Sequence, residues 1–299
     1  MATSRYVPDR GLTVRMGLTM FLLGLLYVAL MAVVFWATNG SWLLAVLIAG
    51  GGLWAQWYFS DSIALAGMGA REVTPAQAPG LHALVDRLCA LADMPKPRVA
   101  VADTDLPNAF ATGRSPDRAV VCVTTGLLRR LDEAELEGVL SHELSHVAHR
   151  DVTVMTIASF VGVLAGFLTR MALWGSGGRR DSNSALAFVA IFLVSLIVYA
   201  LSFILVRTLS RYRELAADRA GAYLTGSPSA LASALVKISG DMGRIPTRDL
   251  REAEAYNAFF FAPAIAEGFS LSSLFSTHPS LRKRLDQLSA ISAQLGRPV

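Results

Sequence analysis

The sequence predicts a predominantly helical α+β membrane protein, in which a domain with a small β-sheet accompanies several membrane-spanning helices. Three observations support this fold class. Of the 299 residues, 53% are hydrophobic and 17% are charged, and the mean hydropathy is +0.46, which is unusual for a soluble protein. Apolar runs long enough to cross a bilayer occur in two pairs. Between the pairs lies a stretch of soluble composition with both helix and strand patterns.

The first pair of apolar runs covers residues 16–36 and 42–59. A secretory signal would have a shorter apolar core and a cleavage site, so residues 1–59 are interpreted as an anchor with two transmembrane helices. Basic residues precede the first run and follow the second, whereas the connection at 37–41 has no charge. The positive-inside rule therefore predicts that both ends of this pair lie in the cytoplasm.

Residues 60–151 open with a predicted helix and then two predicted strands. Pro79 is expected at the start of the helix, in which His82 takes a surface position. The β-branched runs Arg98–Ala102 and 119–124 indicate short strands of a small antiparallel sheet. The segment 108–113 between them could leave an edge strand for an extended peptide, and an ordinary hairpin is an equal alternative.

The two cysteines, Cys89 and Cys122, offer no disulfide framework. One lies in a helical pattern and the other in a strand pattern. Both are therefore expected to be buried and reduced.

The same stretch ends in a metal-binding signature. His142, Glu143 and His146 form a His-Glu-x-x-His pattern, and residues four apart share one face of an α-helix. Both imidazoles could therefore bind one ion, with Glu143 placed to reach a water on it. Asp132 followed by Glu135 predicts the N-cap of this helix.

A second pair of apolar runs, 152–174 and 185–206, forms a predicted helical hairpin over residues 152–206. The hairpin returns the chain to the side from which it left. Arg179 and Arg180 in the turn conflict with the positive-inside rule, because the predicted topology places this turn outside. The pattern therefore leaves open whether the hairpin crosses the bilayer or lies partly against the protein.

A zinc hydrolase site needs a third protein ligand, and the segment 210–221 offers two carboxylates. Glu214 and Asp218 are four residues apart and would share a helix face. One could bind the ion while the other holds a ligand imidazole. The alternative is a solvated helix face whose carboxylates pair with neighbouring arginines.

Several motifs, in order and over nearly the whole chain, resemble those of HtpX-type heat-shock membrane metalloproteases, which are relatives of the CAAX prenyl proteases. They are the His-Glu-Leu-Ser-His motif at 142–146, the Arg-Glu and Ala-Asp pairs at 213–218, and the segments 108–114, 124–127 and 276–279.

The resemblance implies a cytoplasmic, gluzincin-like protease domain built from residues 60–151 and 207–299. It also implies one Zn²⁺ per chain and a role for each residue of the motifs. The implied zinc ligands are His142, His146 and Glu214, the catalytic carboxylate is Glu143, the partner of a ligand is Asp218, and the substrate-aligning edge strand contains Asn108, Ala109 and Phe110.

His278 is a further candidate, because it lies in one of the shared motifs and could support the developing oxyanion. Its alternative role is helix capping, with Pro279 in the first turn of the last helix and Thr277 or His278 as the cap. The basic run 282–284 is expected to be a solvated face, and His149 a residue at the surface or behind the metal ligands.

The implied function is a membrane-bound zinc endopeptidase of the plasma membrane that cleaves misfolded or damaged membrane proteins in the stress response. A catalytically silent chaperone or scaffold with a vestigial zinc site is the alternative. An intramembrane protease is disfavoured, because charged residues flank the motif on both sides. The expected partners are unfolded membrane proteins and the lipid bilayer, and the scattered basic residues predict no nucleic-acid binding.

Overall fold

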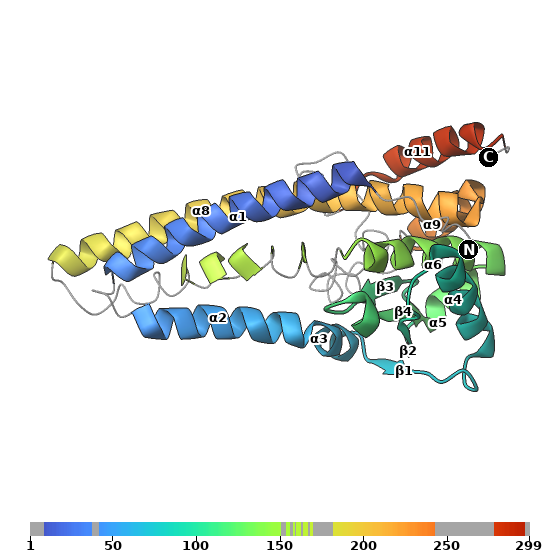
Figure 1. Ribbon diagram of the computed structural model, residues 1–299, viewed down its shortest axis with the longest axis horizontal. Helices are drawn as coiled ribbons and strands as arrows, with labels where there is room; N and C mark the ends of the chain where they lie inside the picture. Colours follow the sequence, from blue (N-terminus) through green and yellow to red (C-terminus); the bar gives the residue numbers. More distant parts are fainter. Residues whose placement is uncertain are drawn as a thin grey trace. The chain divides into compact units, whose positions relative to one another are not determined.

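The computed structural model describes residues 9–37, 42–150, 154–155, 158, 160–162, 164–166, 168–169, 182–242 and 278–296. The chain divides into two compact units. The first contains residues 1–12, 60–152 and 210–299, and the second contains residues 13–59 and 153–209. Figure 1 shows the helices and strands of each unit.

The first unit contains a four-stranded mixed sheet with the strand order β1-β2-β4-β3. The strands are β1 (Ala70–Glu72), β2 (Arg98–Ala102), β3 (Ala109–Thr112) and β4 (Val120–Thr124). The two predicted strands, β2 and β4, are confirmed. The prediction of a purely antiparallel sheet is wrong, because β4 lies between β2 and β3 and pairs with β2 in parallel.

Helices cover both faces of this sheet. Alternate residues of β4 point to opposite faces, as the pleat requires. Val120 and Cys122 pack towards α3 (Ser60–Gly67), whereas Val121 and Val123 join the main core. That core also includes buried residues of α4 (Pro79–Ala92), α5 (Thr125–Arg130) and α6 (Glu133–Ala148).

Two predictions made for α4 and the sheet have different outcomes. Pro79 is the first residue of α4, as predicted. The surface position predicted for His82 is wrong, because its side chain is buried and Nε2 donates to the carbonyl of Val73 at 2.9 Å. This bond ties the segment after β1 to α4.

The prediction for the two cysteines is confirmed, because Cys89 and Cys122 are both free and buried.

Three later helices complete the first unit's core, namely the C-terminal part of α8 (Ser182–Thr225), α9 (Pro228–Met242) and α11 (Leu281–Gln294). The N-cap of α11 is Ser280, whose side chain accepts from the amide of Lys283 at 3.4 Å. The alternative in which Thr277 or His278 caps this helix is therefore wrong. The solvated face expected for residues 282–284 is also wrong at Arg284, which is only 2% exposed.

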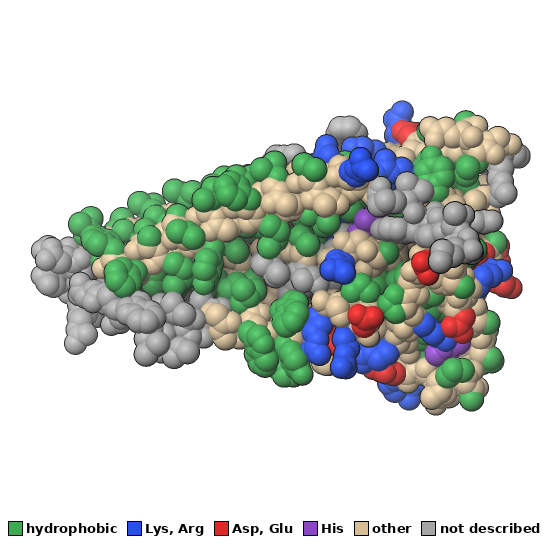
Figure 2. All heavy atoms as spheres, in the orientation of Figure 1, with side chains coloured by type: hydrophobic (Ala, Val, Ile, Leu, Met, Phe, Trp, Pro, Cys, Tyr) green, Lys and Arg blue, Asp and Glu red, His purple; other side chains and the backbone are tan. Residues whose placement is uncertain are grey.

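The second unit contains most of α1 (Arg10–Ala37), α2 (Trp42–Tyr58) and the apolar part of α8. Leu23, Leu30, Phe160 and Val198 are among the residues that form its core. On α1 the outward face is also apolar, and hydrophobic side chains cover the visible face of α1 and α8 (Figure 2). Five exposed large hydrophobic residues of α1 recur at three- and four-residue intervals: Val14, Leu18, Phe21, Leu25 and Val28.

Among the described residues, two helices are long and apolar enough to cross a membrane, Arg10–Trp36 and Val189–Thr225. Only 22% and 17% of their most apolar windows are buried, so these segments are not core helices of a soluble protein. The run predicted at 42–59 forms the 17-residue helix α2. Much of the predicted run at 152–174, and the turn with Arg179 and Arg180, lie outside the described residues.

Candidate metal centre

The helix that carries the metal-binding signature begins with the predicted cap. The Asp132 side chain accepts from the Glu135 amide at 2.9 Å, and the Glu135 side chain accepts from the Asp132 amide at 3.0 Å. This reciprocal capping box fixes the start of α6 at Glu133. His142 and His146 then fall one turn apart on the buried side of the helix.

The structure brings His142 and His146 of α6 together with Glu214 of α8. One potential ligand atom from each lies within 4.8 Å of the other two, and all three side chains are buried. The Nε2 atoms of the two histidines are 3.2 Å apart. Glu214 Oε2 lies 3.5 Å from His142 Nε2, and Glu214 Oε1 lies 3.5 Å from His146 Nε2. Three potential metal-ligand atoms, one from each residue, therefore lie close enough together to bind a single ion.

The other ring nitrogen of His142 is fixed by Asp218. His142 Nδ1 lies 2.9 Å from Asp218 Oδ1, and a carboxylate can only accept, so Nδ1 carries the hydrogen. Nε2 of the neutral ring then presents its lone pair to His146 and Glu214. Two imidazoles and a carboxylate, with one imidazole oriented by a second carboxylate, form the donor set that suits Zn²⁺.

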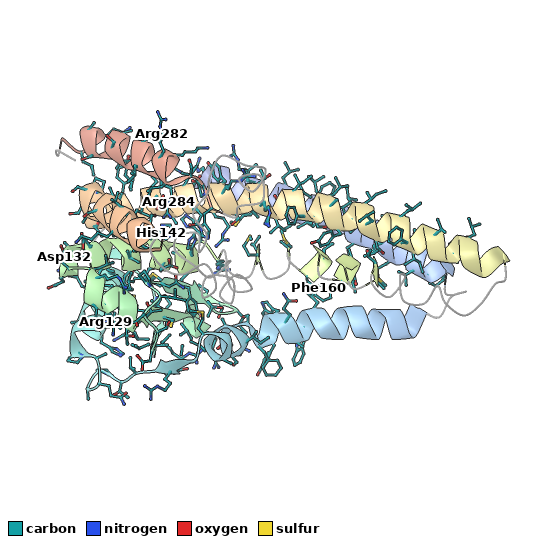
Figure 3. All side chains as sticks on the ribbon, turned by 180° about the vertical axis from the view of Figure 1, so that it is seen from behind. Arg129, Asp132, His142, Phe160, Arg282 and Arg284 are labelled. Atoms are coloured by element: carbon teal, nitrogen blue, oxygen red, sulfur yellow. The ribbon has the colours of Figure 1, made fainter. Side chains whose placement is uncertain are left out.

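Arg284 holds this second carboxylate in turn. Its Nε lies 2.7 Å from Asp218 Oδ2 and its Nη2 lies 2.6 Å from Asp218 Oδ1, so the pair is bidentate and buried. Arg284 lies beside His142, whereas Arg282 of the same helix is exposed (Figure 3). Burial alone would lower the pKa of His142, but its contacts with the carboxylates of Asp218 and Glu214 outweigh burial and raise it.

Glu143 lies between the two histidines in sequence and faces strand β3. The residue is buried, and its carboxylate accepts from the Ala111 main-chain amide at 3.1 Å. Burial raises the pKa of this carboxyl above its usual value. A carboxylate with a raised pKa is a stronger base than an ordinary glutamate and so is better suited to accept a proton.

The residues predicted to align substrate lie in and before β3. Asn108 is fully buried, and its main-chain amide donates to Thr124 Oγ1 at 2.9 Å. Ala109 packs into the main core and Phe110 into the core under α3. The structure therefore places Ala109 and Phe110 on an edge strand next to α6.

His278 and His149 have different surroundings. His278 is buried, and its Nδ1 lies 3.1 Å from Glu214 Oε2, so it belongs to the cluster around the candidate ligands. His149 follows the last turn of α6, and its Nδ1 donates to the Ser145 carbonyl at 2.7 Å.

Sequence reasoning missed two groups that contact these residues, Arg284 and the Ala111 amide. A signal for Arg284 was present, because Leu281, Arg284, Leu288 and Ile291 recur at the spacing of one helix face. No side-chain pattern could identify the Ala111 amide, because every residue except proline has one.

A buried His-Glu-x-x-His helix, a carboxylate from a second helix and two apolar helices together define a membrane-associated metalloprotease. Comparison with known proteins identifies the family of metalloproteases to which the chain belongs. The model of Peptidase family M48 matches residues 75–292. The chain is 60% identical over 295 residues to Protease HtpX homolog 1 of Streptomyces coelicolor, covering 98% of this chain and 97% of the relative.

Other relatives agree. Protease HtpX homologs of Moorella thermoacetica and Pyrococcus furiosus are 55% and 40% identical, and each match covers 96% of this chain and at least 96% of the relative. The crystal structure of S. mikatae Ste24p has the same fold, with a TM-score of 0.55 at 18% identity over 94% of this chain and 67% of that chain. The chain therefore belongs to peptidase family M48, and its relatives are HtpX-type proteases. The predicted resemblance is confirmed.

Proposed function

We propose that this metalloprotease is a zinc-dependent endopeptidase of the plasma membrane that cleaves misfolded or damaged membrane proteins on the cytoplasmic side, as part of a stress response. The observation that carries the proposal is the convergence of His142, His146 and Glu214 within 4.8 Å. These three residues would hold one Zn²⁺ per chain. When bound, zinc supplies Lewis-acid chemistry, polarising the substrate carbonyl and lowering the pKa of a water.

Glu143 is the residue to which we assign proton transfer. Its buried carboxylate takes a proton from the attacking water and returns it to the leaving amine. Asp218 keeps the Nε2 lone pair of His142 available by accepting from Nδ1.

We assign His278 to the negative charge that develops on the substrate carbonyl, because it is buried beside Glu214 and does not cap α11. His278, from the C-terminal part of the chain, would therefore act in the same centre as the two histidines of α6.

We assign alignment of the substrate backbone to the edge strand around Asn108, Ala109 and Phe110. β3 pairs with β4 on one side, so an extended peptide could add to its other side by main-chain hydrogen bonds. This mode of binding requires an unfolded segment and depends little on its side chains. It therefore suits a protease that acts on misfolded proteins.

An ion pair in the first unit supports the proposed cytoplasmic side. Asp9, just before α1, is buried and pairs with Arg219, which follows Asp218 on α8. This contact supports placing Asp9 and the part of α8 that carries Glu214 on the same side of the membrane. The basic residues ahead of the first apolar run indicate that this side is the cytoplasm.

We also propose a division of the chain based on its apolar runs. Residues 1–59 would form the anchor, residues 60–151 and 207–299 the cytoplasmic protease domain, and residues 152–206 an apolar hairpin inserted into it.

Replacing Glu143 by Gln tests the proposal. The substitution keeps the shape of the side chain but removes the base, so cleavage of a denatured membrane protein should fall by about 10²–10⁴-fold. Zinc content should stay at one per chain. The exposed Glu133→Gln on the same helix is the control and should cleave normally. Retained turnover in Glu143→Gln would contradict the assigned role, and bound zinc without turnover in the wild type would favour the silent scaffold.

A further inference from the structure

The inference concerns the donor that holds the Glu143 carboxylate. Among the described residues, the Ala111 main-chain amide donates the one hydrogen bond to Glu143, at 3.1 Å. Glu143 as a whole is only 5% exposed, so little water can replace this donor. Burying an ionised carboxylate without a hydrogen-bond donor costs free energy. The single Ala111 amide therefore contributes strongly to fixing the position of the Glu143 carboxylate.

The register of the sheet explains why this amide is available. The Thr124 amide donates to the Asn108 carbonyl at 2.9 Å, and Phe110 and Thr112 follow at the alternate positions that bond to β4. Ala111 faces Val121 in a pair without ladder bonds, so its N–H points away from β4. It points instead to α6, which packs against β3.

We infer that the Ala111 main-chain amide is a positioning group for the catalytic base, so that the same edge of β3 that receives substrate also fixes Glu143. The inference rests on the proposed role of Glu143. It means that the position of the Glu143 carboxylate is set by strand β3 as well as by helix α6. A shift of the strand would therefore move the base relative to the metal ligands.

The substitution Ala111→Pro removes this N–H without removing a ladder bond, since the amide faces away from β4. A matched control lies on the opposite edge of the same sheet. The Val73 amide bonds to Val99, so the Glu72 amide likewise faces away from its partner strand, and Glu72 lies outside the proposed site. Glu72→Pro therefore carries the same backbone constraint and also loses an exposed ion pair with Arg98.

The first measurement compares kcat, KM and zinc content of the full-length chain in lipid nanodiscs. For Ala111→Pro we expect kcat to fall by about 10- to 100-fold, the range for losing a hydrogen bond to a charged group, with zinc content unchanged. KM should change less than kcat, because the base acts in the chemical step. Glu72→Pro should keep kcat. A rise in KM alone, or equal losses of kcat in the two proline variants, would overturn the inference.

A second measurement needs no activity. In the metal-free protein, Ala111→Pro should lower Tm less when Glu143 is already Ala than when Glu143 is present, because the interaction can be lost only once. Additive shifts would contradict the contact. Glu143→Gln, assayed in parallel, separates the two proposals: if it cleaves normally, the proposed function fails, whereas if only the Ala111 effects are absent, this inference fails alone.

Discussion

At the scale of single residues, the candidate metal centre depends on a chain of two contacts that orients the His142 ring. Arg284 holds Asp218, and Asp218 holds the Nδ1–H of His142, so the tautomer of a candidate ligand is set by side chains that do not touch the ion. All three side chains are buried, which excludes competing water.

Replacing Asp218 by Asn should lower zinc affinity by about 10- to 100-fold, since an amide no longer dictates which ring nitrogen carries the hydrogen. A chelator competition at neutral pH measures this change. Asp86→Asn is the control, because that carboxylate forms an exposed pair with Lys96 far from the histidine motif in sequence. Equal affinities of Asp218→Asn and wild type would show that the contact does not orient the ligand.

Arg284 also shows where reading the sequence fails. The histidine motif requires only the i, i+4 geometry of one helix, so its parts could be found locally. Arg284 lies in a basic run, where exposure is the usual outcome. The helical spacing from Leu281 to Ile291 does indicate the buried face, but the partner Asp218 is 66 residues away and no local pattern identifies it.

At the scale of elements, Glu135 joins the start of α6 to α9. Its carboxylate accepts from Ser233 at 2.7 Å and from Lys237 at 2.7 Å, in addition to the capping-box amide. Burial alone would raise the pKa of Glu135, but these hydrogen bonds outweigh burial and lower it. A lowered pKa means that the carboxylate stabilises the fold fully above its unfolded pKa of about 4.3, and that this stability is lost as pH falls through the folded pKa.

Glu135→Gln should therefore lower Tm by about 2–4 °C at pH 7, and the difference should close as the pH falls below about 4. Thermal unfolding at a series of pH values provides the measurement. Glu133→Gln, also in the first turn but exposed, should shift Tm by no more than about 1 °C. A difference that persists unchanged at low pH would contradict the electrostatic explanation.

The crossing of α6 and α8 depends on Gly221. A Cβ at this position would lie 2.8 Å from Ser141 Oγ and 3.0 Å from the His142 amide nitrogen, so a larger residue would push the two ligand-bearing helices apart. Gly221→Ala should lower both Tm and zinc affinity. Gly240→Ala on α9, where a Cβ would have no neighbour within 4 Å, should leave zinc affinity unchanged. Normal zinc affinity in Gly221→Ala would show that the close approach does not position the ligands.

The elements themselves were predictable to different degrees. The capping box of α6, Pro79 at the start of α4 and the β-branched runs of β2 and β4 are local signals, and each gave the correct element. β1 has only three residues, too few for a periodic pattern. The parallel pairing of β2 and β4 depends on β4 inserting between β2 and β3, which is a property of the whole sheet.

At the scale of the whole molecule, the candidate centre joins residues from two parts of the chain. His142 and His146 precede the apolar segment, and Glu214 follows it, yet their ligand atoms lie within 4.8 Å. The sequence indicated each half of the site. It left open which carboxylate completes it, and the resemblance to a known family supplied Glu214. The structure places Glu214 against both rings and Asp218 behind one of them.

The zinc content of Glu214→Ala tests this account most directly. The wild-type chain should carry one zinc per chain. Because Glu214→Ala removes a proposed direct ligand, its zinc content should fall at least about tenfold at the same free zinc concentration, whereas the control Glu133→Ala should keep full occupancy. Circular dichroism would verify that both variants are folded. Full zinc occupancy with unchanged affinity in Glu214→Ala would contradict the claim that one ion is held by both parts of the chain.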